Sequence, residues 1–110
     1  MEEAAFLELA DAMLVRIESL VERAVEATDL DVDLEPQAGG ILKLEFADGS
    51  QIIINRHAAA KEIWVAARSG GFHYRPEGGQ WLGTRDGREL LGQLEELIGQ
   101  QAGRPVLLQD

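Results

Sequence analysis

The chain has 110 residues, which is enough for one domain with a buried core and too few for two. It contains no cysteine, so disulfides, thiol nucleophiles and cysteine-ligated zinc or iron–sulfur centres are excluded. Twenty acidic and ten basic residues give a formal net charge of −10, the opposite sign from a phosphate-binding surface, so nucleic acid is not an expected partner. We expect a single domain over residues 1–110 whose partners are cations or basic protein surfaces.

The acidic charge is concentrated in the first third of the chain. Residues 1–35 hold eleven of the acidic residues and two of the basic ones. Such a start is unlike a secretory signal or a mitochondrial transit peptide, because both of these need basic residues near the N-terminus. No apolar run is long enough to cross a membrane. We therefore expect a cytoplasmic protein without a membrane partner.

The first segment predicts an amphipathic helix. Its apolar residues fall in one sector of a helical wheel, as in a stripe that faces a core. This stripe consists of Phe6, Leu9, Ala10, Met13, Ile17, Leu20, Val21 and Ala24. A row of acidic residues occupies the opposite side of the helix and consists of Asp11, Glu18, Glu22 and Glu26. The sequence thus predicts a helix with one apolar and one acidic face.

The middle of the chain predicts antiparallel strands. Residues 30–35 alternate between apolar and acidic side chains, and Pro36 with Gly39-Gly40 is expected to end this strand. Further apolar or alternating runs follow at residues 41–46, 51–56, 62–67, 72–75 and 80–82. Asp48-Gly49 between two of these runs predicts a hairpin turn. Because all the gaps are short, they favour an antiparallel meander over parallel crossovers.

A second helix is predicted near the end of the chain. Asp86, three residues before Glu89, resembles the start of a capping box. The apolar face of this helix consists of Leu90, Leu91, Leu94, Leu97 and Ile98. A close approach of the helix to the sheet would explain Gly92 inside it. Gly103 is expected to end the helix, and the apolar residues 106–108 are expected to pack back on the body of the domain.

The order helix, strands, helix predicts an α+β fold. We expect a two-layer α/β sandwich in which the N- and C-terminal helices pack on one face of an antiparallel sheet. The other sheet face then stays open to solvent, and strand alternation places Trp64 on it. Its expected neighbours there are Lys43, Ile53, Asn55, His73 and Arg75. A large aromatic side chain among polar groups is typical of an interface anchor. The alternative is that Trp64 only packs on its cross-strand neighbours.

The acidic residues of the helix and of the segment after it predict one continuous anionic ridge. Its members are Asp11, Glu18, Glu22, Glu26, Asp29, Asp31 and Asp33. Carboxylates are hard oxygen donors that suit Mg²⁺, Ca²⁺, Mn²⁺ and iron ions. The spacing of the last three resembles the start of an EF-hand, but Leu34 and Gly40 stand where that loop needs glycine and glutamate. We therefore expect an open and weak metal site, and the alternative is a solvated acidic face without a ligand.

No motif in the chain indicates catalysis, so we expect no catalytic residues and no enzyme activity. His57 and His73 lie in different predicted elements and lack the spacing of a metal site. Nothing resembles a nucleophile elbow or a glycine-rich phosphate loop.

The predicted central strands resemble the sheet of the frataxin family. The stretch DGSQIIINR at residues 48–56, followed by KEIWVA at residues 61–66, is similar to the sheet signature of that family. The motif GGFHY at residues 70–74, Trp81, the acidic first helix and QQAG at residues 100–103 extend the resemblance over essentially the whole chain. Because no transit region precedes the domain, the chain is similar to the bacterial form, the CyaY type.

This resemblance implies an iron-binding protein of iron–sulfur cluster assembly with a frataxin-like fold. Iron, as Fe²⁺ or Fe³⁺, would bind weakly and reversibly along the ridge. The implied partners are a cysteine desulfurase of the IscS type, which the protein would regulate or supply with iron, and the iron–sulfur scaffold. By position, the ridge carboxylates correspond to Glu18, Glu22, Asp29, Asp31 and Asp33, with Asp11 and Glu26 nearby. The partner-facing residues correspond to Glu18 and Glu22 on the ridge and to Asn55, Trp64 and His73 on the sheet.

Two departures from the family pattern and two other functions qualify this expectation. Ser19 and Arg23 stand where bacterial members often carry acidic residues, which implies fewer bound ions. His57 and Glu62 stand where eukaryotic members often carry glutamine, so sheet-face contacts need not transfer.

A ferroxidase would need a histidine and carboxylate di-iron cage, and the chain has no Glu-x-x-His motif. An acidic adaptor that ignores metal is the other alternative, and a monomer is expected, with iron-dependent oligomers left open.

Overall fold

The computed structural model describes residues 1–109, which form two helices and six strands. Helix α1 spans Glu3–Thr28 and helix α2 spans Leu90–Ala102. Between them lie, in chain order, β1 (Val32–Gln37), β2 (Ile41–Phe46), β3 (Gln51–His57), β4 (Glu62–Ala67), β5 (Gly70–Glu77) and β6 (Gln80–Gly83). Within residues 1–109, neither helix combines the length and the apolar character that are needed to cross a bilayer.

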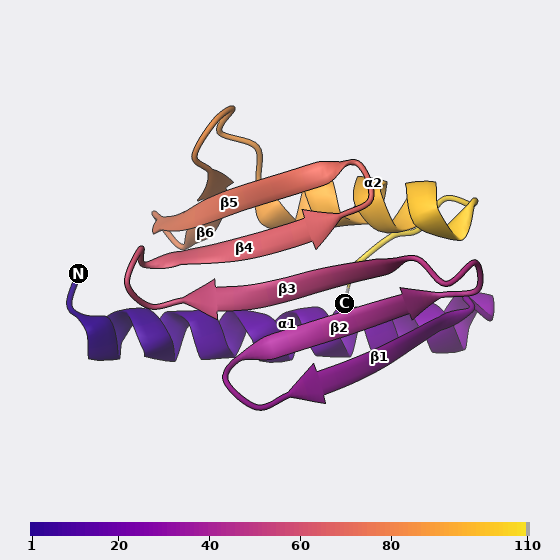
Figure 1. Cartoon of the computed structure of the whole chain (residues 1–110), viewed down its shortest axis with the longest axis horizontal. Helices are drawn as coiled ribbons and strands as arrows, with labels where there is room; N and C mark the ends of the chain where they lie inside the picture. Colours follow the sequence, from indigo (N-terminus) through magenta and orange to yellow (C-terminus); the bar gives the residue numbers. More distant parts are fainter. Residues whose placement is uncertain (110) are drawn as a thin grey trace.

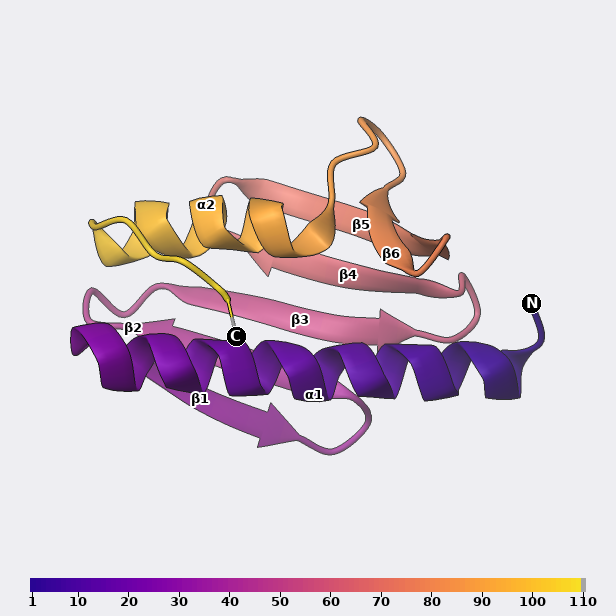
Figure 2. The ribbon, with the colours of Figure 1, turned by 180° about the vertical axis from the view of Figure 1, so that it is seen from behind.

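The strands form one antiparallel sheet in the order β1-β2-β3-β4-β5-β6, so each strand pairs with its neighbours in the chain. Both helices lie on the same face of the sheet (Figure 1 and Figure 2). Helix α1 packs on the half of the sheet that holds β1, β2 and β3, and α2 packs on the other half. The predicted two-layer α+β sandwich with one open sheet face is confirmed.

Strand alternation places the core where the sequence predicted it. Eight inward-facing residues of the central strands are at most 4% exposed, namely Leu42, Leu44, Phe46, Ile52, Ile54, Ile63, Val65 and Tyr74, whereas Phe72 is only partly buried. Burying one large apolar side chain contributes about 1.5–3 kcal/mol, so this layer, packed against the two helices, dominates the stability of the fold.

The apolar stripe of α1 differs from the predicted one at its two edges. Leu9, which was expected in the core, is 45% exposed, whereas Leu14 is 6% exposed. Leu9 lies on the flank of α1 that borders a groove of about 390 Å³, together with Met13, Trp81 and Leu91. Because neither the second helix nor the β5–β6 turn fills this groove, the side chain of Leu9 remains in contact with solvent.

The first strand begins and ends two residues later than expected. It spans Val32–Gln37 and includes Pro36, which was predicted to end it. β1 pairs only with β2 and is therefore an edge strand. A proline without an N–H group is tolerated there, because the outer side of an edge strand has no hydrogen-bonding partner to lose.

Helix α2 begins at a different cap from the predicted one. The carboxylate of Glu89 accepts the N–H of Leu91 at 2.8 Å, which makes Glu89 itself the N-cap. Asp86, the predicted cap, instead accepts the N–H of Arg88 at 3.1 Å in the preceding turn. The prediction at Asp86 is wrong because Glu89 forms a β-bridge with Leu82, which keeps its backbone extended and prevents an earlier helix start.

The glycines of α2 have different roles from those expected. A Cβ atom on Gly92 would meet nothing within 4 Å, so a close approach to the sheet does not explain this residue, and nothing else in the structure does. On Gly99 it would lie 3.1 Å from a backbone oxygen of the returning tail. As predicted, the helix ends at Gly103, whose φ of 74° is left-handed, and the tail then runs back toward α1 (Figure 2). Val106 and Leu108 of this tail are buried in the core.

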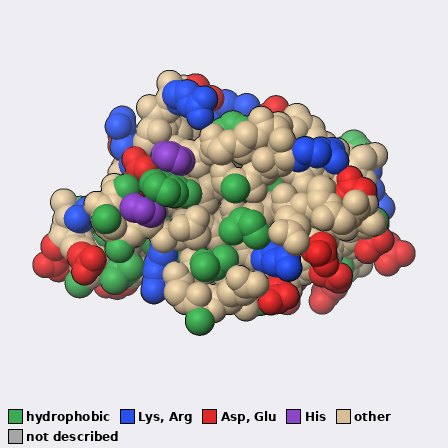
Figure 3. All heavy atoms as spheres, in the orientation of Figure 1, with side chains coloured by type: hydrophobic (Ala, Val, Ile, Leu, Met, Phe, Trp, Pro, Cys, Tyr) green, Lys and Arg blue, Asp and Glu red, His purple; other side chains and the backbone are tan. Residues whose placement is uncertain are grey.

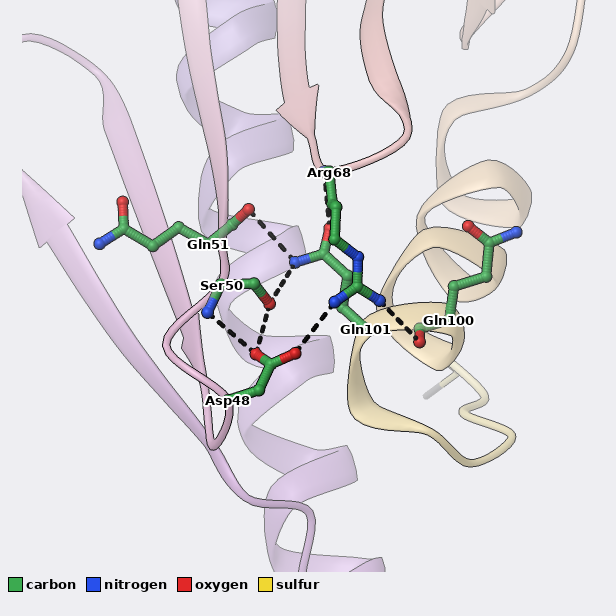
Figure 4. A network of polar contacts seen from close by, with 6 residues as sticks. All are labelled: Asp48, Ser50, Gln51, Arg68, Gln100 and Gln101. Carbon is green, nitrogen blue, oxygen red and sulfur yellow. Dashed lines mark hydrogen bonds and ion pairs between the residues drawn. The ribbon is translucent and has the colours of Figure 1, made fainter.

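A buried glutamine joins the end of α2 to two turns of the sheet (Figure 4). The amide nitrogen of Gln101 donates to Ser50 Oγ at 2.9 Å and to the carbonyl oxygen of Gln51 at 3.3 Å, and its oxygen accepts the N–H of Arg68 at 3.0 Å. Arg68 also pairs with Asp48 at 2.9 Å. The hydrogen bonds that Asp48 accepts from Ser50, together with Arg68, hold the pKa of this carboxyl below its usual value. The network fixes both turns against the helix.

Replacing Gln101 by leucine is expected to lower the free energy of unfolding by about 2 kcal/mol, because the three partly buried hydrogen bonds of the amide are lost. Chemical denaturation measures this loss. The matched control is Gln100→Leu, since the exposed side chain of Gln100 forms no bond in this network and only its carbonyl oxygen accepts from Arg68. Equal stabilities of the two variants would show that the network contributes nothing.

Candidate functional site

The acidic side of α1 borders a groove beside the first strand, which we call the acidic groove. Glu18, Glu22 and Glu26 follow one another at a spacing of four residues, which keeps them on one side of the helix. Asp33 of the edge strand β1 also borders the groove, with its side chain directed toward the open face of the sheet. The groove has a volume of about 390 Å³ and is lined by Glu18, Glu22, Val25, Glu26, Val32, Asp33 and Leu34. An acidic helix face and an acidic strand thus meet in space, as the sequence predicted.

The chain reverses sharply between the helix and the strand, which brings the two walls together. Asp29 caps α1 with a left-handed backbone at φ 56° and ψ 38°. Leu30, which is 3% exposed, then enters the core, and its carbonyl oxygen accepts the N–H of Val32 at 3.1 Å. β1 therefore begins four residues after the helix ends and runs back alongside it.

The four acidic residues of the groove keep their charges unpaired by the rest of the described chain. Within residues 1–109, none of their carboxylates takes part in an ion pair or accepts a side-chain hydrogen bond. Like charges one helical turn apart destabilise a helix by about 0.2–0.5 kcal/mol per pair. The groove is therefore a place where a bound cation or a basic side chain would relieve repulsion.

The structure places the other three predicted ridge residues outside this groove. Asp11 forms an ion pair with Arg56 of β3, in a second groove of about 330 Å³ between α1 and the β1–β2 turn. Glu18 lines both grooves and connects them. Asp29 is the helix cap, and Asp31 is exposed just before β1. Their role as metal ligands stays a prediction.

The acidic surface also continues around the edge of the sheet. In the register of β1 and β2, Asp33 stands opposite Glu45, and Val32 stands opposite Phe46 of the core. Asp33 and Glu45 therefore project to the open face. Figure 3 shows acidic side chains gathered at the end of this face where β1 begins.

No preformed metal cage accompanies these charges. Among residues 1–109, no three histidine, aspartate or glutamate side chains come together in a way that could hold a metal ion. A cation at the acidic groove would therefore be held by one or two carboxylates and would keep several waters, as hard divalent ions commonly do. This arrangement suits weak and reversible binding.

The open sheet face carries a stack of three aromatic rings. The ring of Trp64 on β4 lies between those of His57 on β3 and His73 on β5, with ring centres 3.9 Å and 4.4 Å apart and interplanar angles of 13° and 9°. The indole nitrogen of Trp64 donates to Glu62 at 2.8 Å, and Asn55 stands opposite Trp64 in the register of β3 and β4. The predicted placement of Asn55, Trp64 and His73 on the open face is confirmed, and Trp64 does pack on its cross-strand neighbours.

His57 and Glu62 were expected on the sheet face, but their contacts with Trp64 were not predicted. Both positions carried a signal, because each lies two residues from Asn55 or Trp64 and so has the same strand parity. Only the strand register, which pairs His57 with Glu62, shows that they come together.

One strongly perturbed group lies away from both surfaces. Tyr74 is completely buried and its hydroxyl donates to Gln93 of α2. Burial raises the pKa of Tyr74 well above its usual value, with a smaller contribution from the nearby carboxylate of Asp86. The pair has the character of a satisfied polar contact between sheet and helix rather than of a reactive centre.

Comparisons with known proteins agree with this geometry. The family model of the frataxin-like domain matches residues 1–104. The chain is similar to the iron–sulfur cluster assembly protein CyaY of Dechloromonas aromatica, with 51% identity over 98% of this chain and 99% of the relative. It is similar to the protein of the same name from a Janthinobacterium species, with 48% identity over 100% and 98% of the two chains. These names describe an assembly protein and name no reaction.

Solved structures show the same fold. The frataxin of Psychromonas ingrahamii matches with a TM-score of 0.83 and 30% identity over 100% of both chains. A trimeric frataxin from the yeast Saccharomyces cerevisiae, complexed with ferrous iron, matches with a TM-score of 0.75 and 26% identity over 87% of both chains.

Proposed function

Because the chain belongs to the frataxin/CyaY family, we propose that it acts in iron–sulfur cluster assembly as an iron-binding protein. The names of its bacterial relatives and the ferrous iron in the yeast structure support this role. In this proposal the protein works in the cytoplasm, binds Fe²⁺ or Fe³⁺ reversibly, and regulates a cysteine desulfurase or supplies it with iron.

The observation that carries the proposal is the acidic groove between α1 and β1. The three glutamate carboxylates that line it from α1 are hard oxygen donors of the kind that iron ions accept, Asp33 borders it from the edge strand, and within residues 1–109 none of the four takes part in an ion pair. Since no three of them form a cage, the bound iron would exchange readily. Easy release suits a protein that passes iron on or senses its level.

The same charges would bind a basic surface of the cysteine desulfurase. Glu18 and Glu22 are the proposed contacts, because both line the acidic groove from α1 and Glu18 also lines the second groove. Iron and the desulfurase would then compete for one surface. The protein complex would weaken as salt is raised, since exposed charges are screened beyond about 8–10 Å.

The open sheet face would contact the iron–sulfur scaffold or the same assembly. Trp64 presents a half-buried indole beside Asn55 and His73, and aromatic residues held in this way often dominate binding energies. The two surfaces lie on different sides of the domain, so both partners could be bound at once.

Thermal unfolding at low ionic strength tests the iron proposal. Under anaerobic conditions, Fe²⁺ is expected to raise the melting temperature of the protein, because ions bound only to the folded state stabilise it. Replacing Glu18 and Glu22 by glutamine should remove most of this increase. The matched control replaces Glu2 and Glu3 by glutamine, which changes the net charge equally at the far end of α1.

Two outcomes of adding Fe²⁺ distinguish the iron-binding protein from the metal-independent adaptor and from the ferroxidase. Absence of any increase in the melting temperature would favour the metal-independent adaptor and contradict iron binding at the groove. Oxygen consumption beyond the bound equivalents of iron on admission of air would instead indicate a ferroxidase.

A further inference from the structure

His57 makes two contacts at the open face, a ring stack with Trp64 and a hydrogen bond with the backbone of Ala60. Its ring stacks on Trp64, which carries His73 on its other side, and Figure 3 shows the two histidines on either side of a hydrophobic side chain. In addition, Nδ1 of His57 accepts the backbone N–H of Ala60 at 3.2 Å. The histidine therefore connects the ring stack with the turn that joins β3 to β4.

The turn lies directly beyond the last pair of the β3–β4 ladder, His57 and Glu62. Residues 58–61 lie between the strands, and the N–H of Lys61 donates to the carbonyl oxygen of Ala58 at 3.2 Å. Lys61 has a φ of 56°, which lies in the left-handed region that residues other than glycine and asparagine rarely adopt. The bond from Ala60 to the imidazole is the side-chain contact that holds this strained turn closed.

A nitrogen that accepts a hydrogen bond carries no proton. The neutral ring of His57 must therefore hold its proton on Nε2. A second proton has to go to Nδ1, where it turns the acceptor into a donor that faces the N–H of Ala60. The hydrogen bond is then lost. A half-turn of the ring about its Cβ–Cγ bond exchanges Nδ1 for Cδ2 in front of Ala60, which relieves the clash of the two donors and leaves the ring plane parallel to the indole.

We propose that His57 is a proton-operated switch of the β3–β4 turn, which we call the latch. The neutral imidazole accepts the N–H of Ala60 and restrains the turn, and the charged imidazole loses this hydrogen bond and frees the turn. The stack with Trp64 is preserved in both states, because a charged imidazole is also attracted by an indole face. The device is a property of the fold and does not depend on which partner binds the open face.

The surrounding charges make His57 and His73 respond differently. Glu62 stands opposite His57 in the strand register, and its Oε1 lies 3.5 Å from Nδ1 of His73. Protonation of His73 thus creates an ion pair, whereas protonation of His57 breaks a hydrogen bond. The remaining charged groups near the stack are Lys61 in the turn and Arg75 on β5, which lies 3.5 Å from Glu77.

Nuclear magnetic resonance of the ¹⁵N-labelled protein tests the latch. The ring signals of His57 report its charge, and the amide of Ala60 reports the turn. As the pH falls through the titration of His57, we expect the Ala60 amide shift to follow the same curve and its protection against hydrogen exchange to fall about fivefold, as loss of one hydrogen bond implies. The latch is overturned if the Ala60 amide does not respond when His57 becomes charged.

Three variants make the test specific. His57→Asn supplies an oxygen that can accept the Ala60 amide without titrating, so its amide should stay protected across the pH range. His57→Phe keeps a stacking ring without an acceptor, so its amide should be unprotected even at high pH. His73→Gln should retain the full pH step of the parent protein. An equal step in His57→Asn, or loss of the step in His73→Gln, would assign the effect to another group and overturn the proposal.

Discussion

Replacing Glu18 and Glu22 by lysine is expected to weaken binding to the cysteine desulfurase about a hundredfold at low salt, because each reversal sets a positive charge against a basic partner surface. Both residues lie on the rim of the acidic groove, and no described residue neutralises them. Their reversal should act on the interface rather than on the fold, since their side chains are not part of the core. Isothermal titration calorimetry with the desulfurase measures the change.

The control for this prediction reverses two other charges on the same helix. Glu2 and Glu3 lie at the start of α1, at the opposite end from β1, and their replacement by lysine changes the net charge by the same amount. This control should bind nearly as well as the parent protein. An equal loss in both variants would mean that only the total charge matters, and the groove would then have no special role. Raising the salt concentration should shrink the difference between the variants.

Replacing Trp64 by alanine is expected to weaken contact with the scaffold, or with the scaffold–desulfurase assembly, about thirtyfold, as for an aromatic residue at the centre of an interface. The substitution removes the ring on which His57 and His73 stack and the donor to Glu62. Affinity for the desulfurase alone should change little, because the acidic groove lies at the other edge of the domain. Calorimetry with each partner separates the two effects.

The conservative control is Trp64→Phe, which keeps a ring in the stack but loses the hydrogen bond to Glu62. We expect it to retain most of the affinity of the parent protein. Unchanged scaffold binding in the alanine variant would mean that Trp64 serves only as cross-strand packing. That outcome would restore the simpler interpretation of the ring stack.

The sheet was predictable from the sequence because its signal is local. In β2, β4 and β5 the alternation of side chains indicates which residues face the core, and Tyr74 is buried as predicted. In β3 three consecutive isoleucines leave the alternation ambiguous, and the structure buries Ile52 and Ile54. Predictions were wrong where tertiary contacts decide. Leu9 remains exposed because of an unfilled groove between elements, and the α2 cap is moved to Glu89 by its bridge to Leu82.

The candidate site was predictable in its charges and only partly in its geometry. Helical spacing alone places Glu18, Glu22 and Glu26 on one face, and the short connection to β1 brings Asp33 beside them. The ion pair of Asp11 could not be predicted, because Arg56 is 45 residues away in the sequence. Strand parity likewise placed Trp64 on the open face, but the stack with His57 depends on a register that single-strand patterns do not contain.

Chemical-shift mapping tests the central claim most directly, because it shows which residues sense iron and which sense the desulfurase. In the ¹⁵N-labelled protein, Fe²⁺ and the desulfurase should each perturb the amides of α1 around Glu18 and Glu22 and those of β1 around Asp33. Excess iron should also reverse part of the perturbation that the desulfurase causes. Perturbations on separate surfaces, or no response of the acidic groove to either ligand, would contradict the account.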